Sequence, residues 1–366
     1  MSKYKICVYA ICKNESKFAK RWYESMSEAD YVCVLDTGSE DNSYEIFKDL
    51  GAITKRKIFS KWRFDDARNA SMKLIPKDTD ICVCTDIDEV FEKGWRKKLE
   101  EAWSDETERL RYRYVWSFGT DGKEDVVFLA DKIHKRGKFF WKYPVHEILT
   151  YKNGKKYCTE CAEDLTLYHY ADNEKSRSSY LALLELSVIE NKNDDRNMHY
   201  LGREYYFHGK YEKSIDTLKR HLEMKSATWL DERCASMRYI AKSYVAMNDV
   251  ENAILWYMEA IICAPYLREP YIELASLLLE KNEFYGAVYF VEKALKITKR
   301  NLNYISRADV WSALPYDILS VAYFYIGMKE LSLEYAEKSF LLSPKDKRIE
   351  ENVKIIKSSI ENEKSS

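Results

Sequence analysis

Two hydrophobic periods divide the chain. Up to about residue 170, short apolar runs alternate with polar stretches in which apolar residues recur every three or four positions. The runs predict buried strands, and the polar stretches predict helices. In chain order, we expect a strand over 5–11, a helix over 15–27, a strand over 31–35, a helix over 42–50 and a strand over 81–85. This alternation indicates a Rossmann-like α/β domain with a mostly parallel sheet.

The rhythm changes after residue 88. Apolar runs over 111–118, 126–129 and 165–170 predict further strands joined by irregular loops. These strands suit a subdomain on the side of the sheet where a second substrate would bind. They extend the first domain to about residue 175.

The second half is helical and repetitive. Gly209, Asn248, Asn282 and Gly327 each follow a helical pattern and open a turn, with a large residue four positions earlier and a small one five positions later. Their spacings are 248 − 209 = 39, 282 − 248 = 34 and 327 − 282 = 45, and 34 is the tetratricopeptide period. The pattern predicts stacked helix pairs, which form recognition and assembly surfaces.

The expected organisation is therefore a domain over 1–175, a connecting helix and polar loop over 176–195, and helical repeats over 196–366. The long last spacing requires an insertion, for which the candidate is 301–314. The tyrosines before the turns, such as Tyr205 and Tyr244, are expected to be core residues.

Composition excludes several classes of protein. The 366 residues carry 59 Lys and Arg against 60 Asp and Glu, so no net charge favours nucleic acid or an anionic membrane. Apolar stretches are too short for a membrane span, and the first residues lack a signal peptide's apolar region, so we expect a cytoplasmic protein. The 9 cysteines lack a framework spacing and are expected to be reduced. Cys158 and Cys161 have a metal or redox spacing, but no second pair follows.

The strongest chemical signal is Thr85-Asp-Ile-Asp-Glu89, directly after an apolar strand. Asp86 and Asp88 are two residues apart and can face one site. Carboxylates suit Mg²⁺ or Mn²⁺, which commonly bind one or two of them together with substrate phosphates. The carboxyl end of a buried strand is also where open α/β sheets bind ligands.

Two further polar segments are predicted near the same sheet edge. Asp36 ends a strand and can accept a hydrogen bond from a base or ribose, although the following turn could equally be a helix cap. Arg68, beside Asn69, could neutralise a diphosphate or pair with Asp65 or Asp66.

These motifs occur in the order seen in family 2 glycosyltransferases of the GT-A fold. They are Ile11-Cys-Lys-Asn-Glu15, Asp36-Thr-Gly-Ser-Glu-Asp41, Trp62 with Phe64 and Ala67-Arg-Asn69, and Asp86-Ile-Asp-Glu89. The chain resembles bacterial members fused to tetratricopeptide-like repeats, among them peptide and protein glycosyltransferases. The resemblance covers residues 4 to 170 by motif and the rest by architecture.

The resemblance implies roles for individual residues. The nucleotide sugar would be bound by Asp36, Arg68, Asn69, Asp86 and Glu15. The divalent metal would be held by Asp88, the more direct ligand, and by Asp86, with His169 or His146 completing the metal or diphosphate site. Glu147 would be the catalytic base, and Glu89 would orient Asp88 or face the acceptor.

We therefore expect a metal-dependent inverting glycosyltransferase that moves a hexose or N-acetylhexosamine from a UDP-sugar to a protein or peptide on the repeats. Alternative acceptors are a polysaccharide or a lipid-linked molecule, and a homodimer is possible. A rival hypothesis is a non-catalytic binding protein with a relic GT-A domain. A nucleotidyltransferase is a third, but residues 12–15 lack its glycine-rich phosphate loop.

Overall fold

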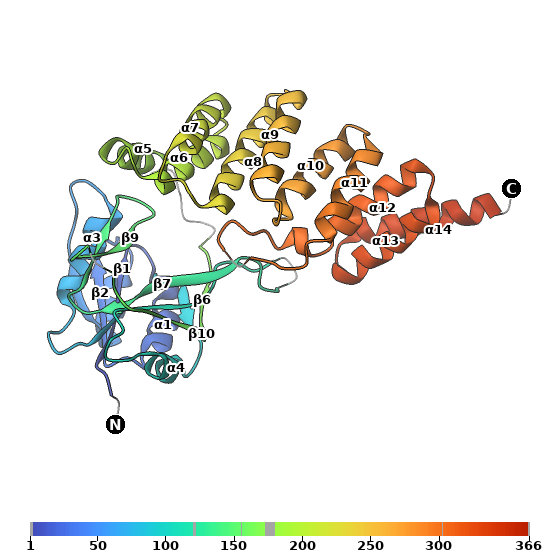
Figure 1. Cartoon of the computed structure of the whole chain (residues 1–366). Helices are drawn as coiled ribbons and strands as arrows, with labels where there is room; N and C mark the ends of the chain where they lie inside the picture. The colour runs from blue at the N-terminus through green and yellow to red at the C-terminus, as the bar shows by residue number, and fades with distance from the viewer. Residues whose placement is uncertain (1–2, 120–121, 155, 173–179, 302, 365–366) are drawn as a thin grey trace. The chain divides into compact units, whose positions relative to one another are not determined.

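The chain folds into two units, which are described separately. The computed structural model describes all residues except 1–2, 120–121, 155, 173–179, 302 and 365–366 (Figure 1). The first unit comprises residues 1–118 and 127–190, and the second comprises residues 119–126 and 191–366.

The first unit is built on one sheet with strand order β3-β2-β1-β4-β7-β6-β10-β5. The β3, β2, β1 and β4 strands are parallel, and so are β6 and β10, whereas β7 and β5 run antiparallel to their neighbours. A separate hairpin pairs β8 with β9. The strands are β1 Ile6–Cys12, β2 Tyr31–Asp36, β3 Ile53–Arg56, β4 Ile81–Cys84, β5 Glu89–Phe91, β6 Arg109–Val115, β7 Val127–Lys135, β8 Phe139–Lys142, β9 Ile148–Tyr151 and β10 Thr159–His169.

Side chains of β1 explain why the sheet is buried on both faces. Ile6, Val8 and Ala10 pack into one apolar cluster, whereas Cys7 and Tyr9 pack into another. Successive strand residues point to opposite faces, so a continuous apolar run requires cover on each side. The helices of this unit are α1 Ser16–Met26, α2 Ser43–Asp49, α3 Phe64–Ser71, α4 Trp95–Ala102 and α5 Tyr180–Glu190, with a 3₁₀ turn over Met72–Leu74.

The predicted strands and helices over residues 5–50 and 81–85 are confirmed to within one or two residues. Sequence reasoning missed β3, β5, β8 and β9, which are short. It also placed the last strand at 165–170, whereas β10 begins at Thr159 and contains an irregularity between Ala162 and Thr166. All nine cysteines are free thiols, including the exposed Cys161.

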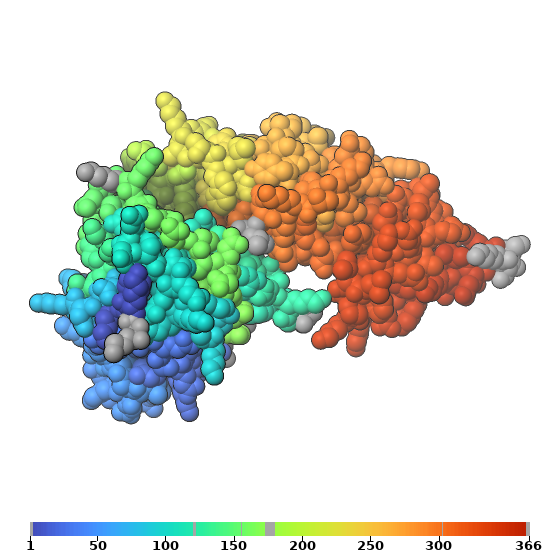
Figure 2. All heavy atoms as spheres, turned by 60° about the horizontal axis from the view of Figure 1, so that its bottom comes forward, coloured from blue at the N-terminus to red at the C-terminus, as the bar shows by residue number. Residues whose placement is uncertain are grey.

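The second unit is a helical repeat of tetratricopeptide type (Figure 1). Antiparallel pairs α6–α7, α8–α9, α10–α11 and α12–α13 stack in order and are followed by α14, and side chains fill the spaces between helices in the yellow to red part of Figure 2. Their bounds are α6 Asp195–Phe207, α7 Tyr211–Glu223, α8 Leu230–Ala246, α9 Val250–Cys263, α10 Glu269–Glu280, α11 Phe284–Leu295, α12 Leu314–Ile326, α13 Lys329–Leu342 and α14 Lys347–Lys364.

The predicted turns lie between the two helices of each pair. Gly209, Asn248, Asn282 and Gly327 have φ of 68°, 60°, 62° and 87°. This left-handed conformation suits glycine and, among other residues, asparagine, and it lets the chain reverse at a helix end. The alignment of these residues therefore identified a real structural repeat.

The small residues of the repeat lie where the paired helices approach each other. Ser214, Ala253, Ala287 and Ser332 are all fully buried. The hydroxyls of Ser214 and Ser332 each donate 2.8 Å hydrogen bonds to carbonyls of the preceding helix, those of Gly202 and Ser320. A larger side chain at these positions would separate the helices.

The chain enters the second unit briefly over residues 119–126 and passes to it finally between Glu190 and Asn191. The expected connecting helix began at residue 176, but residues 176–179 lie outside the described residues, and α5 belongs to the first unit. The predicted insertion is confirmed as the long link between α11 and α12, which includes a 3₁₀ turn over Asp309–Trp311. Within the described ranges, every helix is too short or too polar to span a bilayer.

Candidate functional site

Strand directions bring the predicted site residues to one edge of the sheet. The strands β1, β2, β4, β6 and β10 all run the same way, because β7 is antiparallel to both β4 and β6. Their carboxyl ends therefore share an edge. Asp36 ends β2, Asp86 and Asp88 follow β4, and His169 ends β10.

Asp36 is buried at this edge, with 1% of its surface exposed. Its Oδ1 accepts hydrogen bonds from the backbone N–H groups of Gly38 and Ser39, at 3.0 and 3.1 Å, and from Arg56 Nε at 3.0 Å. Its Oδ2 is also buried but accepts no hydrogen bond from the described residues. A buried carboxylate oxygen without a donor is costly, so this atom is a natural acceptor for a ligand N–H or O–H.

Asp86 lies between two cations. Arg68 Nη2 contacts its Oδ1 at 2.7 Å, and Lys132 Nζ contacts its Oδ2 at 3.1 Å. Burial opposes ionisation of Asp86, but the charges of Arg68 and Lys132 outweigh it and hold its pKa well below the usual range. Because both oxygens are engaged, Asp86 positions these cations and is less suited to bind a metal than Asp88.

Glu89 lies beneath this cluster and is fully buried. Its carboxylate accepts hydrogen bonds from the Asp86 backbone N–H at 2.8 Å and from the Tyr114 hydroxyl at 2.7 Å, and Lys132 Nζ lies 3.3 Å away. Burial raises the pKa of Glu89, although Lys132 opposes the shift. Glu89 therefore orients the segment after β4 and cannot face an acceptor in solution.

Arg68 links both sides of the site from α3. Its side chain is 5% exposed, pairs with Asp86 and with Glu147, and lies over the Trp141 ring at 5.1 Å. The Asn69 amide is held by the backbone of Trp141, donating to its carbonyl and accepting from its N–H at 2.8 Å each. Asn69 thus anchors α3 to β8 and does not line the site through its amide.

Asp88 and His169 form the metal-compatible part of the edge. Asp88 Oδ2 and His169 Nε2 are 3.3 Å apart, and His169 Nδ1 lies 2.8 Å from the Trp116 carbonyl. A carbonyl only accepts, so Nδ1 carries a hydrogen. Burial lowers the pKa of His169, but the Asp88 carboxylate outweighs this effect and raises it. The raised pKa favours a proton shared between these two side chains.

The remaining predicted residues, Glu147, His146 and Glu15, have other partners. Glu147 is 10% exposed and ion-paired with Arg68. His146 has φ of 48° and its ring contacts that of Tyr180 at 6.0 Å between centroids. Glu15 is 4% exposed at the start of α1, where its N–H donates to Ser43 Oγ at 2.7 Å. These contacts connect Glu15 and His146 to the surrounding fold.

Sequence reasoning missed Lys132, Arg56 and Trp116. Lys132 lies in β7, a strand that also carries Asp131, His134 and Lys135, so its sequence context did not mark it as the partner of Asp86. Arg56 ends β3, which was not predicted. The alternative pairing of Arg68 with Asp65 is wrong, because Asp65 pairs with Arg63 at 2.9 Å.

Three solved structures illustrate the similarity to known proteins, and each matches about half of this chain. Scans against protein families and against curated proteins find no match. Solved structures that match include MamA, with 15% identity and a TM-score of 0.37 over 47% of this chain and 85% of that chain. TTC0263, a thermophilic TPR protein of Thermus thermophilus, has 16% identity and a TM-score of 0.37 over 49% and 89%. YrrB, described as a TPR protein with an unusual peptide-binding site, has 15% identity and a TM-score of 0.37 over 48% and 83%. At these values, the similarity carries nothing about activity or ligand, and the repeat itself is defined by the helix pairs described above.

Proposed function

We propose that the first unit binds a nucleotide sugar and transfers its sugar, and that the helical repeats bind the protein or peptide that receives it. The observation that carries this proposal is the Asp88–His169 pair, 3.3 Å apart at the carboxyl edge of the sheet. Carboxylate oxygen and imidazole nitrogen together suit Mn²⁺ or Mg²⁺ when phosphate oxygens complete the coordination.

The nucleotide end of the donor would lie at Asp36. Its buried Oδ2 can accept a hydrogen bond from a base N–H or a ribose hydroxyl. Arg68 and Lys132 provide positive charge beside the expected diphosphate, although Asp86, Glu89 and Glu147 already balance them. A bound divalent cation would supply the additional positive charge that stabilises the leaving diphosphate.

In the proposed reaction, the acceptor atom bonds to the anomeric carbon as the bond from that carbon to the diphosphate oxygen breaks. The acceptor loses its proton to a base. Glu147 is the sequence-based candidate, but its ion pair with Arg68 also fits a positioning role. A Glu147→Gln variant distinguishes the roles, because a base controls the turnover rate, whereas a positioning residue also changes nucleotide affinity.

A second candidate is a protein that binds partners through its repeats without catalysis. The stacked helix pairs favour it, because such arrays present extended binding surfaces. On this hypothesis the strand-end carboxylates would hold the fold together and bind no nucleotide. A transferase for a polysaccharide or lipid-linked acceptor is the alternative form of the first candidate.

A donor assay tests the first candidate. The purified chain is incubated with a panel of UDP-sugars and Mn²⁺, and release of UDP is measured with and without acceptor peptides. We expect Asp88→Asn to slow release by about 10²-fold, because it removes charge from the proposed metal site. Asp49→Asn, an exposed aspartate on α2, is the matched control.

Binding and turnover together separate the candidates. If no UDP-sugar raises the thermal stability of the wild-type chain and none is hydrolysed, the transferase proposal fails. Binding of a protein partner under the same conditions would then favour the second candidate.

A further inference from the structure

The link between α11 and α12 folds back over earlier repeats. The corresponding links before α8 and α10 cover only residues 224–229 and 264–268, whereas this one covers residues 296–313. Residues 303–307 of this link contact α6, α8 and α10. We call them the resident segment.

Tyr304 anchors one end of the resident segment. Its ring stacks on that of Tyr200 of α6, with centroids 5.8 Å apart and an angle of 26°, and meets the edge of Trp229 at 5.4 Å. Its hydroxyl donates to Glu232, and the neighbouring Asn303 donates to Asp231 Oδ2 at 2.7 Å. One aromatic ring and two hydrogen-bond donors thus occupy an aromatic and acidic surface.

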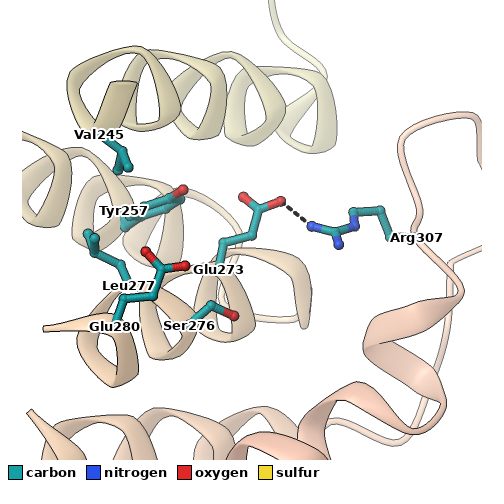
Figure 3. Close-up of a pocket in the computed structure, with 7 residues that line it drawn as sticks. All are labelled: Val245, Tyr257, Glu273, Ser276, Leu277, Glu280 and Arg307. Atoms are coloured by element: carbon teal, nitrogen blue, oxygen red, sulfur yellow. Dashed lines mark hydrogen bonds and ion pairs between the residues drawn. The ribbon is translucent and has the colours of Figure 1, made fainter. Parts of the chain in front are cut away.

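Arg307 anchors the other end. Its Nη1 lies 2.7 Å from Glu273 Oε1, and its backbone N–H donates to Glu269 Oε1 at 3.0 Å. Figure 3 shows the Arg307 side chain reaching Glu273. Both residues line a cavity of about 250 Å³, together with Tyr257 and Glu280. The cavity leaves space beside Arg307 for additional side chains.

Three of the carboxylates beneath the resident segment, Asp231, Glu232 and Glu273, also contact residues outside the segment. Asp231 accepts from the Tyr266 hydroxyl at 2.7 Å, and Glu232 lies 3.4 Å from His221 Nε2. Glu273 is paired with Arg238 at 2.6 Å and with Lys242 at 2.8 Å. Departure of the segment would therefore leave Asp231 and Glu273 partnered, which removes the main penalty of breaking a buried ion pair there. Glu269 is 2% exposed and would lose the Arg307 backbone N–H as a donor, so a replacing peptide must supply a donor at that position.

We propose that the resident segment is a built-in occupant of a peptide-binding surface on α6, α8 and α10. Its natural competitor is a partner peptide that carries tyrosine and arginine at the spacing of Tyr304 and Arg307. Glu273 is already paired with Arg238 and Lys242, so the negative charge that selects a basic, aromatic peptide over an acidic one comes from Asp231, Glu232 and Glu269. This inference rests on the proposed partner-binding role of the repeats and is independent of sugar transfer.

The segment is tethered, so it competes at a high effective concentration, about millimolar for a short flexible link. A free peptide therefore binds the wild-type chain weakly. Weakening the tethered anchors should raise the apparent affinity for the same peptide added in solution.

The probe is a fluorescein-labelled peptide with the sequence of residues 299–309, followed by fluorescence anisotropy without nucleotide sugar. We expect the full-length Tyr304→Ala/Arg307→Ala variant to bind it about tenfold more tightly than the wild-type chain. A peptide with the same two alanines should bind neither protein. Trp229→Ala, at a site 40% exposed, should weaken binding to the double variant.

Equal binding by the wild-type chain and the double variant would overturn the proposal. So would absent binding to a double variant that retains wild-type helicity by circular dichroism. If the double variant unfolds, the Arg307→Gln variant is tested alone. It should bind the labelled peptide more tightly than the wild-type chain by a smaller factor, and unchanged affinity overturns the proposal. A concentration-dependent dimer of the wild-type chain by light scattering would assign the surface to a second copy instead. UDP release, measured separately, reports on the transferase proposal and not on this one.

Discussion

His169 Nε2 lies 3.3 Å from Asp88 Oδ2, at the edge where β10 pairs with β5. The two residues are far apart in sequence, yet antiparallel pairing sets His169 opposite Glu89, next to Asp88. The carbonyl of Trp116 fixes the ring of His169 from its other nitrogen. The fold therefore holds a carboxylate oxygen and an imidazole nitrogen side by side.

Replacement of His169 by asparagine should weaken Mn²⁺ binding in the presence of UDP by about tenfold or more, because one donor is lost while its supporting backbone remains. Isothermal titration calorimetry measures the affinity. The control is His208→Asn, at a histidine that is 39% exposed on the repeats. Unchanged Mn²⁺ affinity in His169→Asn would contradict the proposed metal site.

Replacement of Asp36 by asparagine should reduce nucleotide affinity by about tenfold, which corresponds to about 1.4 kcal/mol. The amide cannot supply a charged acceptor at the position of the buried Oδ2. The ion pair with Arg56 is lost, but Arg56 is 46% exposed, so the free energy of unfolding should change by less than about 1 kcal/mol. A large loss of stability with intact nucleotide binding would assign Asp36 a purely structural role.

Replacement of Lys132 by methionine should lower the free energy of unfolding by about 3–5 kcal/mol, because the fully buried Glu89 loses its cation. Urea denaturation measures the change. Adding Glu89→Gln should recover part of the loss, since the remaining group is neutral and keeps its hydrogen-bond acceptor. Additive losses in the double variant would show that the two residues do not interact energetically.

His134 should make the first unit less stable as the pH is lowered from 7 to 5, whereas the raised pKa of His169 acts in the opposite direction. Burial lowers the pKa of His134 to about 4, and its Nε2 lies 2.9 Å from the Tyr9 hydroxyl. Its unfolded pKa is about 6.5, so below that value the unfolded chain binds a proton that the folded chain does not. The expected loss from this histidine is about 2 kcal/mol between pH 7 and pH 5, continuing until the folded pKa is reached.

Urea denaturation at both pH values measures this effect. The His134→Gln variant should lose less stability than wild type over that interval, because glutamine does not titrate. His208→Gln is the exposed control. Parallel losses in all three proteins would show that His134 does not cause the pH dependence.

Substitution of Gly202 by alanine should destabilise the first helix pair by about 1–3 kcal/mol. An added Cβ would lie 2.4 Å from Leu218 Cγ, across the contact of α6 with α7. Leu218→Ala in the same chain should make the Gly202→Ala change nearly neutral, although Leu218→Ala is costly alone. Thermal unfolding of the four proteins gives the coupling energy.

The sequence predicted the elements whose patterns are local. The apolar runs of β1, β2 and β4 and the turn residues Gly209 and Asn248 needed no long-range information. Short strands such as β5 and β9 were missed, because their residues become strand only when a distant partner pairs with them.

Asp86 and Asp88 could be predicted because they follow a recognisable strand. Their interaction partners on other strands of the sheet could not be predicted from the sequence. Asp86 and Asp88 were singled out together, yet their environments differ. Asp86 is held by Arg68 and Lys132, whereas Asp88 faces His169. Lys132 comes from an antiparallel strand, so its proximity to Asp86 depends on register that one sequence does not display.

In the second unit, each helix pair contacts chiefly the neighbouring pairs. The free energy of local opening should therefore differ along the array, with the lowest value at an end. α14, at the end of the stack, has a neighbouring helix on one side only among the described residues, whereas α8 is packed between pairs. Local opening should therefore start at α14 and proceed inward, and amide protons should exchange fastest in that helix. Protease trimming from this end would remove α14 first and then whole helix pairs, while the pairs nearest α6 keep their packing.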